Sequence, residues 1–275
     1  VLLVLGFFVS FSGFSQDSKE RNQENINVNK FRQLYQEFSS PNMFRTASGA
    51  PGPAYYQQQA DYKMDIELDD ENKRIYGSET ITYTNNSPDN LEYLWVQLDQ
   101  NIRKKDSPSL LIDGGGVSPA YLPSGFTKEF LTDSFDGGFN IEYVVDENKN
   151  PLKHFVNQTM MRVDLPNTLK SGESFSFSIK WWYNIQDHVN QDGRSGYESF
   201  DKDGNRVYII AQFFPRMAVY NEVEGWQNYQ FWGDGEFALP FGNYDVKITV
   251  PSDHILDATG ELQNRKNVFS KEMIK

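Results

Sequence analysis

The side chains that most often do chemistry are few in this chain, and their spacing fits no catalytic site. The sequence has three histidines, His154, His188 and His254, and no cysteine. No histidine has a partner at metal-ligand spacing, and neither H-E-x-x-H nor C-x-x-C occurs. A G-x-S-x-G motif is also absent, and the carboxylates are scattered rather than paired. The residues by themselves therefore indicate a binding or scaffold module and not a self-contained enzyme.

Two loops contain residues that occur in ion-binding or phosphate-binding sites, but both are better explained as plain connections. Residues 201–205 (DKDGN) resemble a fragment of a calcium loop that lacks the remaining ligands and the closing Glu. Because Asp-Gly joins two strand-like runs, we expect a hairpin turn there, with calcium as the weaker alternative. The glycine triplet at 114–116 is not followed by Lys-Ser/Thr, so it predicts a loop and no phosphate site. His188 and His254 are expected to be exposed loop residues.

Alternation of apolar and polar residues predicts the strands that must position any site. The predicted strands are 61–68, 74–85, 91–98, 140–145, 159–165 and 174–185. Short polar turns join the first three, which favours an antiparallel meander. Glu79, Ile81 and Tyr83 share one face of the second strand, and the last strand is apolar on one face only. Such a strand needs a hydrophobic partner layer, so the sequence predicts an all-β fold, an antiparallel two-layer β-sandwich.

The chain divides into three segments by composition. Residues 1–15 (VLLVLGFFVSFSGFS) are typical of the second half of a secretory signal peptide; a buried strand or a true anchor is the alternative. Residues 16–54 form a polar lead-in with a possible short helix over 28–38, and residues 55–275 form the β-sandwich domain. We therefore expect export, to the periplasm, the outer surface or the medium. Without cysteine, neither disulfides nor an N-terminal lipid-modified Cys are possible.

The overall charge limits the partners. The formal net charge is −12, which argues against a nucleic-acid partner because phosphate binding needs a basic face. Aromatic residues make up 15% of the chain, so core burial can stabilise an exported domain that has no disulfides.

Four motifs near the C-terminal end of the sequence resemble a known family. In chain order they are QFFPRMA at 212–218, GEFALP at 235–240, YDVKITVP at 244–251 and ATGEL at 258–262. Their order and spacing resemble the N-terminal β-domain of the aminopeptidase-N-like (membrane alanyl aminopeptidase) family of gluzincin zinc metallopeptidases. Upstream, the predicted strands between 62 and 98 resemble the opening of the same domain, so the similarity covers roughly residues 55–265.

The resemblance implies a saddle-like, non-catalytic N-terminal domain that forms one wall of a peptide-binding cleft. The catalytic zinc domain, which would carry H-E-x-x-H, is missing from this sequence. The resemblance therefore implies no cofactor in this chain, zinc in the missing catalytic domain of the same polypeptide, and a peptide as the substrate of the full-length protein. This chain alone should be inactive.

Two residues are carried over from the family as substrate-binding residues, Gln212 and Phe214. The position of Gln212 contacts the substrate near its N-terminus; the alternative is a strand-end residue that binds backbone. Where this chain has Phe214, many members have Gln or Glu, which hold the free amine of the peptide. A phenyl ring offers an ammonium only a cation–π contact, so strict aminopeptidase selectivity does not follow. The family's Ala-Arg is also altered, to Ala218-Val219.

A second function class remains open, a free-standing carbohydrate- or protein-binding β-sandwich with Trp226 and Trp232 as a platform. Against it, the aromatic residues near the motifs are expected mainly to pack in the core or against another domain, with substrate contact as the alternative. These residues are Phe213, Phe214, Trp226, Phe231 and Trp232.

Overall fold

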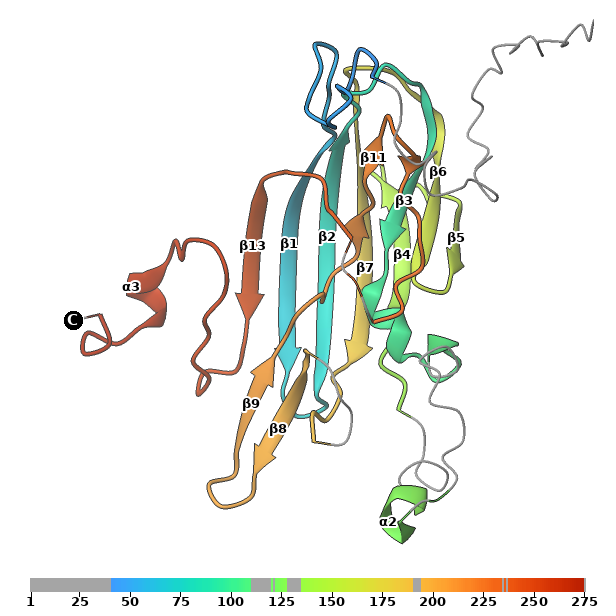
Figure 1. The fold of residues 1–275 in the computed structure, drawn as a ribbon. Coiled ribbons are helices and arrows are strands. Elements are labelled where there is room, and N and C mark those ends of the chain that lie inside the picture. The colour runs from blue at the N-terminus through green and yellow to red at the C-terminus, as the bar shows by residue number, and fades with distance from the viewer. Residues whose placement is uncertain are drawn as a thin grey trace, which may run out of the picture. The chain divides into compact units, whose positions relative to one another are not determined.

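The computed structural model describes residues 41–109, 120, 122–127, 135–189, 194–233, 235 and 237–274. Two sheets dominate this part of the chain (Figure 1). The first has the strand order β13 (Tyr244–Thr249), β1 (Gln59–Asp69), β2 (Arg74–Thr84), β7 (Ser174–Asn184), β4 (Asn140–Asp146). The second has the order β10 (Arg216–Met217), β3 (Leu91–Gln97), β6 (Met160–Leu169), β5 (His154–Asn157).

Shorter elements surround these sheets in the described part of the chain. The two-stranded ribbons are β8 (Gly196–Phe200) with β9 (Asn205–Ile209), and β11 (Tyr220–Asn221) with β12 (Gly225–Trp226). The helical segments are η2 (Asp99–Arg103), α2 (Pro123–Phe126) and α3 (Arg265–Val268). The fold is therefore all-β, as the alternating sequence patterns predict.

The alternation in β1, β2 and β7 places one side of each strand in the core. The three strands pair antiparallel over their full lengths, so their buried residues fall in register. Because the side chains of a strand alternate between two faces, a shift of one residue would expose the whole apolar set. The buried side chains of this face are Ala60, Tyr62, Met64, Ile66, Leu68, Ile75, Glu79, Ile81, Tyr83, Phe177, Ile179, Trp181 and Tyr183.

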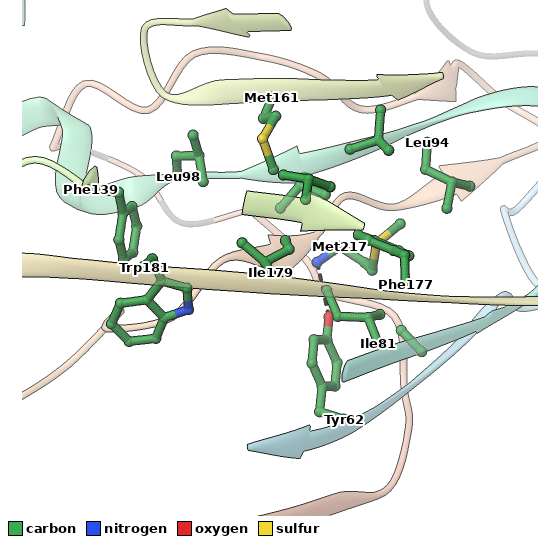
Figure 2. Packing of buried hydrophobic residues seen from close by; sticks show 14 of the residues in the cluster. Tyr62, Ile81, Leu94, Leu98, Phe139, Met161, Phe177, Ile179, Trp181 and Met217 are labelled. Atoms are coloured by element: carbon green, nitrogen blue, oxygen red, sulfur yellow. Dashed lines mark hydrogen bonds between the residues drawn. The ribbon is translucent and has the colours of Figure 1, made fainter. Parts of the chain in front are cut away.

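One hydrophobic cluster joins the two sheets, as a two-layer sandwich requires (Figure 2). Leu94 and Met161 of the second sheet belong to the same cluster as Ile81 and Ile179 of the first. A hydrogen bond crosses between the layers, because the Met217 N–H on β10 donates to the Tyr62 hydroxyl on β1 at 2.9 Å (Figure 2). The core is thus closed by both apolar packing and a buried polar contact.

The predicted meander is wrong. β1 and β2 pair as expected, but β3 joins the other sheet, where it pairs with β6 and β10. The crossover is the predicted turn at 85–89, and the buried Asn85 amide organises it: its NH₂ donates to the Asp89 and Leu169 carbonyls at 2.7 and 3.1 Å. An alternating pattern specifies which face of a strand is buried but not which sheet it joins, so the sequence pattern did not reveal this crossover.

The strand β13 also departs from the antiparallel prediction. It pairs with β1 in parallel, with Tyr62 opposite Tyr244 and Ile66 opposite Ile248. β13 is the last strand of its sheet, so within the described part of the chain no strand lies beside its outer edge (Figure 1).

The hairpin prediction at 201–205 is confirmed. β8 and β9 pair antiparallel around it, with Phe200 opposite Asn205. Gly204 has a φ of 68°, a conformation that glycine adopts without strain. Among the residues described here, no group of three or more His, Cys, Asp or Glu side chains could hold a metal ion.

Three predictions fall outside the described residues: the signal-peptide-like segment 1–15, the helix over 28–38 and the loop at 114–116. Within the described residues, no helix has both the length and the apolar character needed to cross a membrane.

Candidate functional site around Gln212

The segment that contains Gln212 is held at both ends. It follows β9 and enters β10, which pairs with β3 through Arg216 opposite Gln97. The side-chain amide of Gln100 donates to the backbone carbonyls of Ala211 and Gln212, at 3.0 Å each. These contacts fix the backbone of the segment against η2.

Gln212 itself has an unusual backbone conformation. Its φ is 51°, in the left-handed region that non-glycine residues seldom occupy. The carbonyl of Gln212 is satisfied by Gln100, while its side-chain amide has no hydrogen-bond partner among the described residues. The side chain is half-buried. An amide with spare donors and an acceptor, on a backbone clamped in a strained conformation, is suited to bind a polar ligand.

Phe214 belongs to a cluster of rings, the aromatic cluster, that also contains Tyr62, Phe213 and Tyr244. The Phe214 ring meets Phe213 edge-on at 5.0 Å and Tyr62 edge-on at 5.6 Å between centroids. Tyr62 and Tyr244 stack at 4.8 Å. Edge-on and offset contacts of this kind are the favoured aromatic geometries. Phe214 therefore ties the motif segment to β1 and β13 by packing.

An ion pair lies beneath the segment. Arg216 donates from Nε and Nη2 to one oxygen of Asp99, at 2.9 and 2.6 Å, and the Asp99 side chain is 1% exposed. Burial raises the pKa of Asp99, and the Arg216 guanidinium opposes that rise. Because removing either partner would leave the other charge uncompensated, this pair helps to fix the register of β10.

Glu79 is the buried acidic residue of the first sheet. It is 2% exposed, and neither carboxyl oxygen has a hydrogen-bond partner among the described residues. Burial raises the pKa of Glu79 well above its ordinary value, which favours the neutral acid. Its place among apolar residues of the strand was visible in the sequence, but its isolation was not.

Other residues singled out in the sequence lie apart from this segment or act as packing residues. His188 is exposed, as predicted, whereas His254 is part-buried because its ring packs near Tyr208 and its Nδ1 lies 2.9 Å from Asp253. The prediction of an exposed His254 is therefore wrong. Trp226 packs against Tyr83 and Tyr220, at 5.9 and 5.2 Å between centroids. This packing does not favour Trp226 as part of an exposed platform.

Apolar side chains along and after β13 are exposed. We call this set the C-terminal flank; it comprises Tyr244, Val246, Ile255, Leu256 and Leu262, which are 38–77% exposed. Single exposed apolar residues are normal, but several of them on and after an edge strand mark a surface suited to an interaction. The flank adjoins the aromatic cluster through Tyr244.

The chain is similar to known proteins in its structure but matches none of them by sequence. No protein-family model matches the chain, and no curated protein matches it. Its structural neighbours are M1 zinc metallopeptidases. One from Deinococcus radiodurans has a TM-score of 0.36 and 11% identity, over 78% of this chain and 38% of that one. A mutant of the same description bound to a Tyr-Ser-Ala substrate has a TM-score of 0.35 and 12% identity, over 78% and 39%.

A two-domain M1 zinc metallopeptidase mutant bound to L-tryptophan gives the same values, 0.35, 12%, 78% and 39%. The similarity concerns the fold only. The match spans less than two fifths of the length of these structures.

Sequence reasoning missed several residues that build the site. Gln100 clamps the segment, and Tyr62 and Tyr244 complete the aromatic cluster. No local signal could have found Gln100, because its partners are more than 100 residues away, with sequence separations of 111 and 112. The apolar alternation of β1 predicted a buried Tyr62 but not its partners.

Proposed function

We propose that this chain is the non-catalytic N-terminal β-domain of an exported zinc metallopeptidase of the aminopeptidase type, and that it forms one wall of the peptide-binding cleft. One observation carries the proposal. The segment that resembles the family's substrate-contacting motif holds Gln212 in a clamped left-handed conformation, with its side-chain amide free of partners among the described residues. A residue that served only to bind backbone would have its amide engaged.

The C-terminal flank supports the second part of the proposal, the contact with a catalytic domain. Two of its exposed apolar residues, Tyr244 and Val246, lie on the edge strand β13, and Tyr244 stacks on Tyr62 of the aromatic cluster. A catalytic domain docked there would cover apolar surface and would bring its own residues close to the motif segment. We propose that this domain belongs to the same polypeptide.

The residues of this chain do not fit a zinc ion. The sequence has no cysteine and no H-E-x-x-H, and the described residues contain no group of three or more potential metal ligands. Zinc ligation requires such groups, so the metal of the proposed peptidase would be held by the catalytic domain. The task of this chain is to bind and orient the peptide.

Phe214 shapes the proposed specificity. Its ring is half-buried in the aromatic cluster and offers no hydrogen-bond acceptor. Through its exposed part it can give an ammonium a cation–π contact of about 0.5–2 kcal/mol, weaker than a carboxylate pair. We therefore propose that recognition of the free amine depends less on this chain than in members with Glu or Gln at this position.

The test uses the purified chain and a longer version that includes a downstream H-E-x-x-H domain. The chain alone should not hydrolyse alanyl- or leucyl-aminomethylcoumarin, and the longer version should. In the longer version, Gln212→Ala should raise KM about tenfold with a smaller effect on kcat, because it removes binding contacts to the peptide. Gln158→Ala, at an exposed glutamine that also has a left-handed backbone conformation, is the matched control.

Hydrolysis by the chain alone, or the absence of an H-E-x-x-H domain from the complete gene product, would refute the proposal. Export is tested separately by fractionating the cells that make the protein. A mature N-terminus near residue 16 in the envelope or the medium is expected, and a cytoplasmic protein that retains residues 1–15 would contradict it.

A further inference from the structure

A polar surface pocket lies where the start of β1 meets the loop before β13. Its volume is about 360 Å³. We call it the amide pocket because five of its lining residues carry side-chain amides, and the sixth side chain is aromatic. The lining side chains are Gln57, Gln58, Gln59, Asn86, Asn243 and Phe241. None of these belongs to the segment around Gln212.

Asp61 orients two of the amides. Its carboxylate accepts hydrogen bonds from the Gln59 side-chain NH₂, at 3.0 Å to each oxygen, and from the backbone and side-chain nitrogens of Asn243, at 2.8 and 3.1 Å. These bonds direct the two NH₂ groups at the Asp61 carboxylate and lower the pKa of Asp61. The side-chain carbonyl oxygens of Gln59 and Asn243 are left without partners among the described residues.

On the other side of the amide pocket, too, the side-chain NH₂ groups of Gln57 and Asn86 are hydrogen-bonded while their side-chain carbonyl oxygens have no partner among the described residues. The Asn86 NH₂ donates to the Gln57 backbone carbonyl at 2.8 Å, and the Gln57 NH₂ donates to the Tyr55 hydroxyl at 3.0 Å. Gln58 is buried and uses both ends of its amide, with Asn85 and Asn86. Gln57, Gln59, Asn86 and Asn243 thus each present a free carbonyl oxygen on a side chain held by its own NH₂.

Phe241 is held in an exposed position by its backbone. The ring is 75% exposed, although the Ala60 N–H donates to the Phe241 carbonyl at 2.9 Å and the Tyr62 N–H donates to the Asn243 carbonyl at 2.8 Å. Gly242 lets the two backbones approach, because a Cβ there would overlap the Ala60 carbonyl oxygen. These backbone bonds fix the main chain of Phe241 at the start of β1, in the position that leaves the ring exposed beside the pocket.

The polar groups and the aromatic ring that line the amide pocket indicate which class of ligand it would bind. Four acceptor oxygens, together with the second N–H of the Gln57, Asn86 and Asn243 amides, suit a ligand with several hydroxyl groups, which donate and accept, and the exposed ring suits an apolar face. No lysine or arginine lines the pocket, which disfavours an anion, and the Asp61 oxygens are already occupied, which disfavours a calcium ion. A pyranose ring has hydroxyl donors on its rim and C–H groups on its face. The volume lies at the small end of the range of about 300–1,000 Å³ for ligand pockets.

We propose that the amide pocket binds a neutral pyranose saccharide, with a C–H face on Phe241 and hydroxyl groups donating to Gln57, Gln59, Asn86 and Asn243. This site is independent of the proposed peptidase role. It would serve to hold the protein on glycan-bearing substrates or surfaces.

The test is saturation-transfer NMR on the purified chain with maltotriose, cellotriose and chitotriose, followed by calorimetric titration of the best binder. Phe241→Ala should weaken binding about tenfold, since the aromatic contact is of the order of one hydrogen bond or more. Gln57→Ala and Asn86→Ala should each weaken it about threefold or more. The matched control is Phe155→Ala, which removes a ring that is 67% exposed on β5 and should leave the affinity unchanged.

Three results would overturn the proposal: no binding of any of the three sugars, equal affinity in Phe241→Ala and the unaltered chain, or a calorimetric titration that detects binding of calcium chloride and not of sugar. Circular dichroism of each variant separates loss of the site from loss of the fold. No peptidase assay enters this test, so its outcome is independent of the function proposed above.

Discussion

The rings of Tyr62 and Tyr244 lie nearly parallel, with centroids 4.8 Å apart and 10° between their planes. The same two residues face each other in the parallel register of β1 and β13. The Tyr62 hydroxyl also accepts the Met217 N–H from β10. One tyrosine therefore connects the edge strand, the first sheet and the end of the motif segment.

Replacing Tyr62 by Phe should test this connection. The ring would still stack on Tyr244, but the buried Met217 N–H would lose its acceptor. An unpaired buried donor costs about 1–3 kcal/mol, so the free energy of unfolding measured by urea denaturation should fall by that amount. Tyr143→Phe, at a side chain that is 38% exposed, is the control and should leave stability unchanged. Equal effects of the two substitutions would contradict this role of Tyr62.

Glu79 should make the stability of the domain depend on pH. Its folded-state pKa is raised by burial above the ordinary value of 4.5. The stability that the protonated Glu79 contributes is therefore fully present below the pKa of Glu79 in the unfolded chain. It is lost as the pH rises through the pKa of Glu79 in the folded domain. Glu79→Gln should abolish this loss and should stabilise the domain at neutral pH by more than about 1 kcal/mol, because an amide does not ionise and so does not favour the unfolded chain as the pH rises.

The measurement for Glu79 is urea denaturation at several pH values from mildly acidic to neutral. The variant and the unaltered chain should have similar stability at the acidic end and should diverge towards neutral pH. Glu92→Gln, at an exposed position of β3, is the control and should follow the unaltered chain. A constant difference between Glu79→Gln and the unaltered chain at every pH would count against the ionisation of Glu79 as the cause.

Removing one partner of the buried pair Asp99–Arg216 should lower the free energy of unfolding much more than removing one partner of an exposed pair. Asp99→Ala leaves the Arg216 guanidinium, which is 14% exposed, without its bidentate partner. Breaking a buried pair in this way costs about 3–5 kcal/mol. The control is Asp65→Ala, which removes the exposed pair with Lys247 and should cost no more than about 1 kcal/mol.

A double variant tests whether the loss in Asp99→Ala comes from the unpaired charge of Arg216. Asp99→Ala with Arg216→Met should be more stable than Asp99→Ala alone, because no charge remains buried without a partner. Additive losses in thermal denaturation would show that the two side chains act independently.

Gly77 should be essential to the packing of β2 against β7. A Cβ at this position would overlap the indole ring of Trp181, which is fully buried. Gly77→Ala should therefore destabilise the domain by about 1–3 kcal/mol through overpacking. Ser78→Ala, on the opposite face of the same strand, should have little effect. Adding Trp181→Phe to Gly77→Ala should recover part of the loss, and failure to recover any would show that the clash is not with the indole.

Local sequence patterns predicted most strands of the two sheets and the buried face of each. The period of two predicted a half-buried strand for β1 and one apolar face for β7, and the structure buries Tyr62 and Trp181 accordingly. This succeeded because successive side chains of a half-buried strand point alternately to the core and to solvent, so apolar and polar residues alternate in the sequence. The hairpin at 201–205 was predictable for a similar reason, since Asp-Gly favours the backbone conformation of its turn.

Strand pairing between distant segments was decided by the tertiary structure alone. The transfer of β3 to the second sheet and the parallel pairing of β13 with β1 depend on which apolar surfaces meet, and a local pattern does not contain that information. The same limit applies to the sites. Gln100 reaches Gln212 across 112 residues, and Asn243 reaches Asp61 across 182.

The sequence by itself determined an all-β sandwich without cysteine or a metal-binding motif, together with the residue types around Gln212. The tertiary structure decided how Gln212 is clamped, why Phe214 packs against Tyr62, and that five amides and Phe241 form one pocket. The physical reason is that secondary structure follows from neighbouring residues, whereas a site is made by side chains that folding brings together from distant parts of the chain.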